Sequence, residues 1–140
     1  MRLQDKRAII TGAASGFGAG MARKFIAEGA SVMLADIDGD AARELSDALG
    51  PAAFACQVDV SQGADMQRLS NSAMEAFGRI DILINNAGVT HLPDALEDIS
   101  EVDFDRVLAV NAKSVYLTAR HFVPAMKARG RGAILNVAST

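Results

Sequence analysis

The chain has 140 residues, half of them apolar, which is enough for one domain with a buried core. Its 14 basic and 17 acidic residues give a formal net charge of -3, so we expect no nucleic-acid or anionic-membrane partner. A single cysteine excludes an internal disulfide, and no apolar run approaches the ~18 residues that a membrane span needs. The charged N-terminus has no signal-peptide pattern, and we therefore expect a soluble, cytoplasmic protein.

Short apolar runs alternate with amphipathic helical patterns along the chain. The patterns predict strands at 8–11, 31–35, around 54–58, 82–84 and 134–137. Between them they predict helices at 18–28, at 41–49 and from an N-cap at Ser61 to Gly78. Two more helices precede the last strand, one that opens with a capping box at Ser100 and a longer one from about 112 to 129. Strands that are apolar on both faces and joined by helices are typical of a covered parallel sheet. We therefore predict a Rossmann-type α/β fold, a doubly wound parallel sheet with helices on both faces, in one domain over residues 1–140.

A glycine-rich loop joins the first predicted strand to the first predicted helix. It contains Gly12, Ser15, Gly16, Phe17 and Gly18 in a G-x-x-x-G-x-G pattern, which differs from the G-x-G-x-x-G dinucleotide fingerprint. Glycines allow a tight turn and a close approach of backbone N–H groups to a phosphate, and the next helix points its positive end at the anion. The loop alone would also fit a plain strand-to-helix turn; with its context it predicts a pyrophosphate site.

A carboxylate follows the second predicted strand, where a nucleotide-binding fold holds the adenosine ribose. Asp36 can accept hydrogen bonds from both ribose hydroxyls, and its charge would repel a 2′-phosphate. Position 37 is isoleucine, and the glycine loop contains no Lys or Arg for such a phosphate. We therefore expect NAD rather than NADP, with Asp36 and Ile37 among the cofactor-binding residues.

These features together resemble the short-chain dehydrogenase/reductase family over the whole chain. Thr11 to Gly18 resembles the family's cofactor loop, Asp59-Val60 resembles the pair that meets the adenine, and Asn85-Asn86-Ala87-Gly88 resembles the motif that follows the fourth strand. The resemblance implies that the cofactor is contacted by Asp59, Val60, Asn86, Ala87 and Gly88.

Two further residues match the catalytic tetrad of that family. Asn111 matches its asparagine, which holds a water in a proton relay, and Ser139 matches its serine, which polarises the substrate carbonyl. Read from the residues alone, Asn111 lies on the apolar helical face of Phe104 and Leu108, so that its amide must find partners, and neighbouring backbone would also serve. Ser139 would otherwise be an ordinary strand-end serine. No cluster at metal-ligand spacing is present, so we predict no metal site.

The resemblance implies hydride transfer between NAD(H) and a small-molecule secondary alcohol or ketone, in a homo-oligomer (dimer or tetramer). The family's general acid/base is the tyrosine of a Tyr-x-x-x-Lys motif beyond the serine, whereas the one tyrosine here, Tyr116, precedes the serine and is followed by Arg120. We therefore expect a sheet truncated after its fifth strand, a domain incomplete at its C-terminal side, and no turnover by residues 1–140 alone.

Three readings of the function stay open at this point. A sugar, polyol or steroid alcohol dehydrogenase is slightly favoured over a 3-oxoacyl-thioester reductase, because Asp36 favours NAD and the reductases of this family more often use NADP. The third reading is a non-catalytic NAD-binding or regulatory module, against which the presence of both Asn111 and Ser139 argues.

Overall fold

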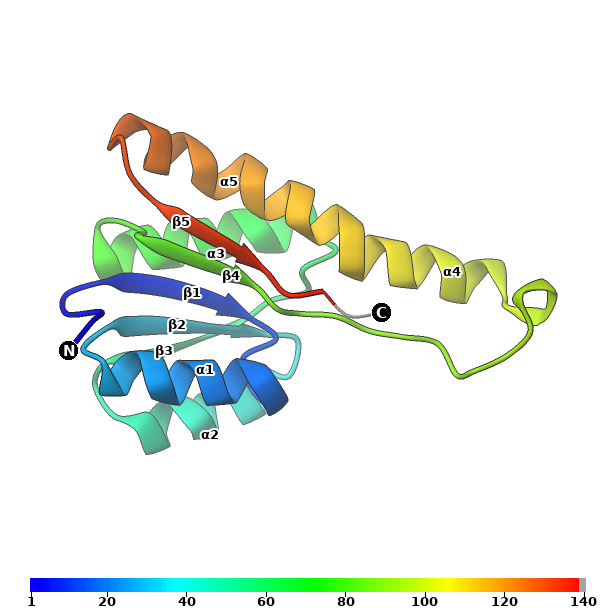
Figure 1. Cartoon of the computed structure of the whole chain (residues 1–140), viewed down its shortest axis with the longest axis horizontal. Helices are drawn as coiled ribbons and strands as arrows, with labels where there is room; N and C mark the ends of the chain where they lie inside the picture. Colours follow the sequence, from blue (N-terminus) through cyan, green and yellow to red (C-terminus); the bar gives the residue numbers. More distant parts are fainter. Residues whose placement is uncertain (139–140) are drawn as a thin grey trace.

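The computed structural model describes residues 1–138 and contains a five-stranded parallel sheet with the order β3-β2-β1-β4-β5 (Figure 1). The strands are β1 (Arg7–Thr11), β2 (Ser31–Asp36), β3 (Ala53–Gln57), β4 (Ile82–Asn85) and β5 (Ala133–Asn136). The helices are α1 (Gly16–Ala27), α2 (Gly39–Leu49), α3 (Gly63–Phe77), α4 (Glu101–Leu108) and α5 (Ser114–Ala128), with a 3₁₀ turn η1 (Leu96–Asp98) and a π-helical segment η2 (Ala109–Lys113).

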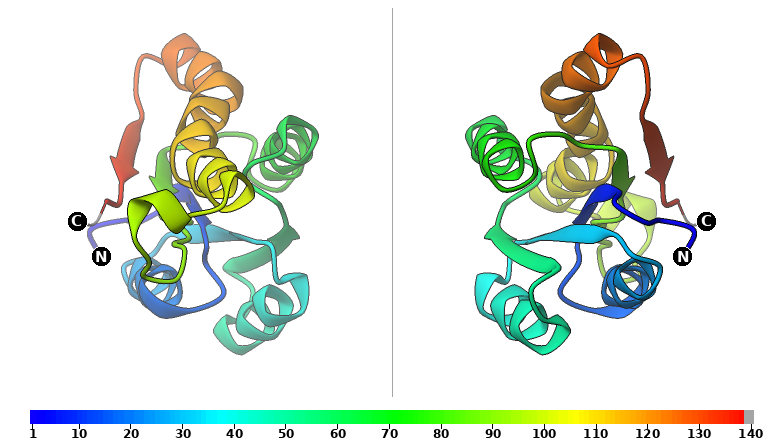
Figure 2. Two further views of the ribbon diagram at one scale, coloured as in Figure 1. Left: turned by 90° about the vertical axis from the view of Figure 1, so that its right-hand side faces the viewer. Right: turned by 90° about the vertical axis from the view of Figure 1, so that its left-hand side faces the viewer.

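Helices cover both faces of the sheet, α1 and α2 on one side and α3 and α5 on the other (Figure 2). Successive strand residues point to opposite faces, so Ile9 packs toward α3 and α5 whereas Ile10 packs toward α1 and α2. Both isoleucines are fully buried, which explains why the strands read as continuous apolar runs. The doubly wound Rossmann-type fold predicted from the sequence is confirmed.

The strand order reverses between β1 and β4. β1 pairs in parallel with β2 on one side and with β4 on the other, and the chain leaves these two neighbours toward opposite faces of the sheet. Open α/β sheets bind ligands in the crevice outside the carboxyl ends of the strands at such a reversal. The glycine loop after β1 and the Asn-Asn-Ala-Gly segment after β4 both begin at this point.

Several predicted helix starts differ from the structure; α2, for example, begins at Gly39 and not at residue 41. The first helix begins at Gly16, two residues earlier than expected, with Ser15 in the N-cap position. Ser61 is not the N-cap of α3; Gln62 is, without a side-chain capping bond. The reason is local, because the backbone N–H and the hydroxyl of Ser61 both donate to Asp59 Oδ1, at 2.9 and 2.7 Å. By contrast, the predicted capping box at Ser100 is confirmed, since its Oγ accepts the Asp103 N–H at 3.1 Å and donates to that carboxylate at 2.9 Å.

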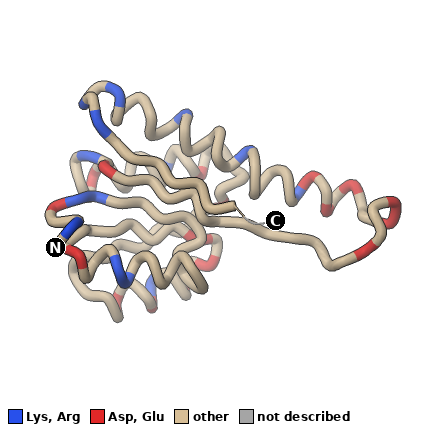
Figure 3. Tube along the Cα trace, in the orientation of Figure 1, with Lys and Arg blue, Asp and Glu red and all other residues tan. Residues whose placement is uncertain are grey.

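The helix expected from about 112 to 129 is part of a longer helical rod. α4, η2 and α5 follow one another without an intervening loop, and the α4 end extends beyond the carboxyl edge of the sheet (Figure 1). Acidic residues gather on α4 and the segment before it, whereas basic residues predominate along α5 (Figure 3). Within residues 1–138, no helix is long and apolar enough to cross a membrane.

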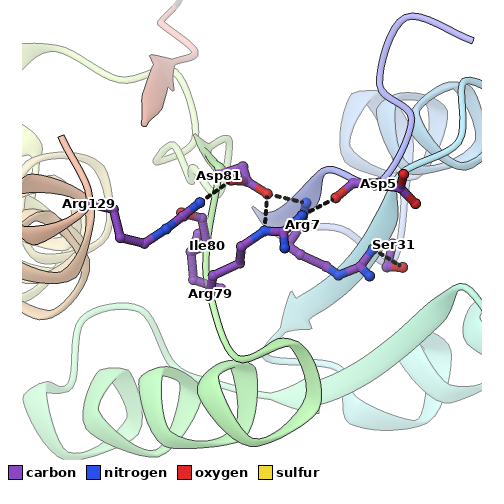
Figure 4. Close-up of polar contacts among 7 residues, drawn as sticks. All are labelled: Asp5, Arg7, Ser31, Arg79, Ile80, Asp81 and Arg129. Atoms are coloured by element: carbon purple, nitrogen blue, oxygen red, sulfur yellow. Dashed lines mark hydrogen bonds and ion pairs between the residues drawn. The ribbon is translucent and has the colours of Figure 1, made fainter. Parts of the chain in front are cut away.

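A network of charged groups around Asp81 ties together the amino-terminal edge of the sheet (Figure 4). Its carboxylate accepts the backbone N–H of Arg7 at 3.0 Å, Nε of Arg79 at 3.2 Å and Nη2 of Arg129 at 3.1 Å. Burial by itself raises the pKa of this carboxyl, but the Arg7 amide and the two guanidinium groups outweigh it, so that the net pKa lies below its ordinary value. The network therefore joins β1, β4 and the end of α5 at the edge opposite the glycine loop.

Candidate functional site

The glycine loop has a backbone that other residues would not easily adopt. Gly12 and Gly16 have φ angles of +62° and +52°, in the left-handed region that favours glycine. A Cβ atom at Gly12 would lie 2.8 Å from Cα of Ala87, and one at Gly18 would overlap the carbonyl oxygen of Gly12. The loop can therefore fold this tightly against the end of β4 only because these positions carry no side chain.

The amino end of α1 opens toward the same place. Ser15 occupies the N-cap position without a side-chain capping bond, and the first turn of α1 contains no acidic residue. The first N–H groups of a helix have no partner within the helix, and they lie at the positive end of its dipole. This end of α1 can therefore accept an anionic group.

Side chains from β1 and β4 hold the loop in place. Thr11 Oγ1 accepts the backbone N–H groups of Asn86 and Ala87, at 3.0 and 3.1 Å, and donates to the carbonyl of Ile84 at 3.3 Å. The Asn86 side-chain amide in turn donates to the carbonyls of Thr11 and Gly12, both at 3.0 Å. Hydrogen bonds of the Thr11 hydroxyl and of the Asn86 side-chain amide thus join the carboxyl ends of β1 and β4, where the strand order reverses.

A cavity of about 380 Å³ lies along this edge of the sheet. All of the predicted cofactor residues except Gly18 line it, that is Gly12, Ser15, Gly16, Phe17, Asp36, Ile37, Asp59, Val60, Asn86, Ala87 and Gly88. Gly18 lies behind the loop, where its role is steric. The lining contains two carboxylates and, within the part of the chain that the structure describes, no lysine or arginine.

Comparison with known proteins assigns the family. The model of the short chain dehydrogenase family matches residues 6–140 of the chain. The chain belongs to this family. It is 42% identical over 140 residues to galactitol 2-dehydrogenase of Agrobacterium fabrum (strain C58), an alignment that includes 99% of this chain and 54% of that protein. The chain thus spans about half the length of the curated relatives it matches.

Two solved structures of short-chain enzymes are similar to the whole chain. The 3-ketoacyl-(acyl-carrier-protein) reductase from Brucella melitensis, crystallised with NADH, has a TM-score of 0.95 and 43% identity, over 98% of this chain and 58% of that one. A metagenomic short-chain oxidoreductase in complex with NADP has a TM-score of 0.94 and 35% identity, over all of this chain and 65% of that one. Short-chain dehydrogenases with this fold therefore include binders of either dinucleotide.

The structure describes only one of the two candidate tetrad residues. Asn111 lies in the π-helical segment η2, and its amide binds Val89 twice, with Oδ1 accepting the backbone N–H at 2.9 Å and Nδ2 donating to the carbonyl at 2.8 Å. The apolar face expected around it is not buried within residues 1–138, since Phe104 and Leu108 are about half exposed. Ser139 lies outside the described residues.

Three lining residues were missed from the sequence: Val58, Val89 and Val110. Valine next to a motif reads as core, but Val58 directly precedes Asp59 and Val89 directly follows Gly88, so these two could have been found from their neighbours. Thr11 was quoted as the start of the cofactor loop, but its role as a hydrogen-bonding link between β1 and β4 was not predicted. A threonine at the end of a buried strand gives no sign of which backbone groups it will meet.

Reactive side chains outside this cavity, among residues 1–138, have other environments. Burial raises the pKa of the Cys56 thiol, which disfavours a nucleophilic thiolate and fits a packing role on β3. A separate hollow near α4 is lined by His91, Asp94 and Asp103, and the Ser100 hydroxyl and then Arg106 lower the pKa of the Asp103 carboxyl. Among residues 1–138, no group of three or more His, Cys, Asp and Glu side chains could hold a metal ion.

Proposed function

We propose that this chain is the NAD(H)-binding portion of an oxidoreductase that moves a hydride between the nicotinamide and a secondary alcohol or ketone. The observation that carries the proposal is one cavity lined by both the glycine loop and the Asp36 carboxylate, at the reversal of strand order. The residues present fit a dinucleotide, because the glycines leave room for a pyrophosphate and Asp36 can accept the ribose hydroxyls. Residues 1–140 form a single domain on this proposal.

The preference for NAD over NADP follows from charge. Asp36 would repel a 2′-phosphate, Ile37 beside it is apolar, and no basic residue of the described chain lines the cavity. Titration calorimetry should find tighter binding of NAD than of NADP. An Asp36→Ala variant should lose this discrimination, with NAD affinity reduced roughly ten- to a hundredfold by the loss of hydrogen bonds to a charged group. Tighter binding of NADP by the unmodified chain would overturn the preference.

The proposed chemistry divides between Asn111 and Ser139. Bound NAD(H) supplies or accepts the hydride at C4 of the nicotinamide. Ser139 would donate a hydrogen bond to the substrate oxygen and polarise it. Asn111, held by Val89 at the rim of the cavity, would keep a water in the proton relay, and the π-helical segment that carries it is a feature often found at functional sites.

The substrate class has two candidates. The similarity to galactitol 2-dehydrogenase supports a secondary alcohol of a polyol or sugar, and the similarity to the ketoacyl reductase supports an oxoacyl thioester. Because that reductase was crystallised with NADH, the NAD preference inferred from Asp36 does not separate the two classes. We favour the polyol; faster reduction of an acetoacetyl thioester than oxidation of hexitols by the whole enzyme would favour the thioester instead.

We also propose a homo-oligomer in the cytoplasm. The rod of α4 and α5 leaves apolar side chains exposed, among them Val102, Phe104 and Tyr116, which supports association through this surface. Sedimentation of the whole enzyme as a monomer would contradict it. A purely regulatory NAD-binding module is the less favoured alternative, because such a module has no need of the Asn111–Val89 arrangement.

A further inference from the structure

We propose that Asp36 is also a positioning residue of the glycine loop, which holds the turn between β1 and α1 in place whether or not a dinucleotide is bound. The Oδ2 atom of Asp36 accepts the backbone N–H of Ala14 at 2.9 Å. Ala14 directly precedes Ser15, the N-cap of α1. The carboxylate that we assign to the ribose therefore also determines where the phosphate-facing end of α1 begins.

Asp36 can serve this purpose because its own position is fixed from several sides. Its carbonyl accepts the N–H of Val58 at 2.8 Å, and its Oδ1 accepts the N–H of Asp38 at 3.0 Å. The neighbouring Ala35 carbonyl accepts the N–H of Ala13 at 3.3 Å, so that two successive residues of β2 bind two successive residues of the loop. The last residue of β2 is thus joined to β3, to the turn before α2 and to the glycine loop.

The two roles of Asp36 are compatible with the chemistry of a carboxylate. Its two oxygens offer about four acceptor positions, of which the Ala14 and Asp38 amides occupy two. The side chain still lines the cavity, where the remaining positions can accept ribose hydroxyls. Hydrogen bonds from N–H groups to an ionised carboxylate are shorter and stronger than those between neutral groups, so the bond to Ala14 is suited to ordering a glycine-rich turn.

A functional consequence follows, and it rests on the proposed NAD site: a substitution of Asp36 that changes the cofactor preference should also change the order of the glycine loop. A negative charge beside a phosphate-binding loop repels the phosphate, but the same carboxylate orders the loop that binds it. Replacing Asp36 with a small neutral residue to admit NADP should therefore also disorder the loop. Binding of both dinucleotides would fall, and the removal of charge alone would not make NADP bind well.

The first test measures amide hydrogen exchange in the free protein by NMR. In the unmodified chain the Ala14 amide should exchange more slowly than that of Ser15, which has no acceptor among the described residues. In Asp36→Ala the Ala14 amide should exchange roughly ten- to a hundredfold faster, as expected for the loss of a hydrogen bond to a charged acceptor. Asp59→Ala, which removes a second carboxylate of the same cavity, should leave Ala14 unchanged. Equal exchange of Ala14 and Ser15 in the unmodified chain would overturn the proposal, even if Asp36→Ala failed to fold.

The second test uses inorganic pyrophosphate, which has no ribose for Asp36 to bind. Asp36→Ala and Asp59→Ala each remove one negative charge from the same cavity, so repulsion alone predicts tighter pyrophosphate binding by both. Loop positioning predicts that Asp36→Ala binds pyrophosphate more weakly than Asp59→Ala, and equal affinities would contradict it. If the exchange and pyrophosphate results hold but NAD does not bind, the proposed function fails and the positioning role stands.

Discussion

Two glycines of the first helix, Gly18 and Gly20, provide a matched test of the packing between the loop and α1. A Cβ atom at Gly18 would overlap the carbonyl of Gly12 and lie 2.8 Å from the Asn86 side-chain nitrogen, whereas one at Gly20 would have open space around it. Gly18→Ala should destabilise the fold by about 1–3 kcal/mol, the usual range for overpacking, and weaken NAD binding. Gly20→Ala should stabilise it by about 0.5–1 kcal/mol, because alanine is favoured over glycine inside a helix.

Chemical denaturation of the two variants, together with calorimetry of NAD binding, would check this pair. A Gly18→Ala variant as stable as the unmodified chain would mean that the loop can move away from α1, contrary to the structure. Equal NAD affinity in Gly18→Ala would mean that the turn at Gly12 does not shape the cavity. The Gly20→Ala variant controls for the general effect of adding a methyl group to this helix.

At the residue scale, sequence reasoning predicted the cavity better than its hydrogen bonds. The glycines and Asp36 could be found because they occur together in one strand–helix–strand context, although the loop alone also fits a plain turn and Asp36 alone an exposed acid. The bond from Ala14 to Asp36 could not be found, because its donor is a backbone N–H and any residue but proline provides one. Asn111 was expected to need partners for its amide, but no pattern of residues indicated that the backbone of Val89 would supply both.

At the scale of secondary-structure elements, Asp81 joins β1, β4 and α5 and should make stability depend on pH. The pKa of its carboxyl is lowered in the folded chain, so the unfolded state binds the proton more tightly. Its contribution is therefore fully present above the unfolded pKa of about 3.9 and is lost as the pH falls further through the folded value. Asp81→Asn should cost about 1–3 kcal/mol at neutral pH, because it leaves two guanidinium groups without their anion.

Denaturation of Asp81→Asn and of the unmodified chain at several pH values would check this. The difference in the free energy of unfolding between them should shrink as the pH is lowered below about 4. Asp47→Asn provides the control, because that carboxylate is exposed and has no ion pair within residues 1–138. A difference that stays constant down to acid pH would show that the free energy of unfolding depends on the shape of the Asp81 side chain and not on its charge.

The order of the elements could be predicted from the sequence, but some of their ends could not. Hydrophobic periodicity reports which face of a helix is buried, and it does so over many residues. A helix end is decided by one or two local hydrogen bonds, as at Ser61, where the Asp59 carboxylate binds the residue expected to cap the helix. The π-helical turn around Asn111 likewise has no periodic pattern, and the sequence therefore suggested two separate helices instead of one rod.

At the scale of the whole molecule, the cavity lies where the ends of the strands meet the helical rod. Its loops and carboxylates lie at the carboxyl ends of β1, β2, β3 and β4, and the rod that follows β4 contributes one lining residue, Val110, next to the tetrad candidate Asn111. On the proposed function, the residues assigned to the dinucleotide precede both tetrad candidates in the chain. A consequence is that cofactor binding and turnover can be measured as independent properties of residues 1–140.

We expect residues 1–140 to bind NAD without oxidising alcohols. They contain one tyrosine, Tyr116, whose hydroxyl accepts a hydrogen bond from Arg120 at 3.0 Å and which is absent from the cavity lining. Without a general acid/base at the substrate oxygen, a rate loss of ~10²–10⁴-fold is expected. Calorimetry should therefore detect NAD binding by the purified chain, while NADH formation from secondary alcohols stays at background. Steady NADH formation would contradict this, and a Tyr116→Phe variant would then show whether Tyr116 takes the proton, since loss of that activity would assign the role to it.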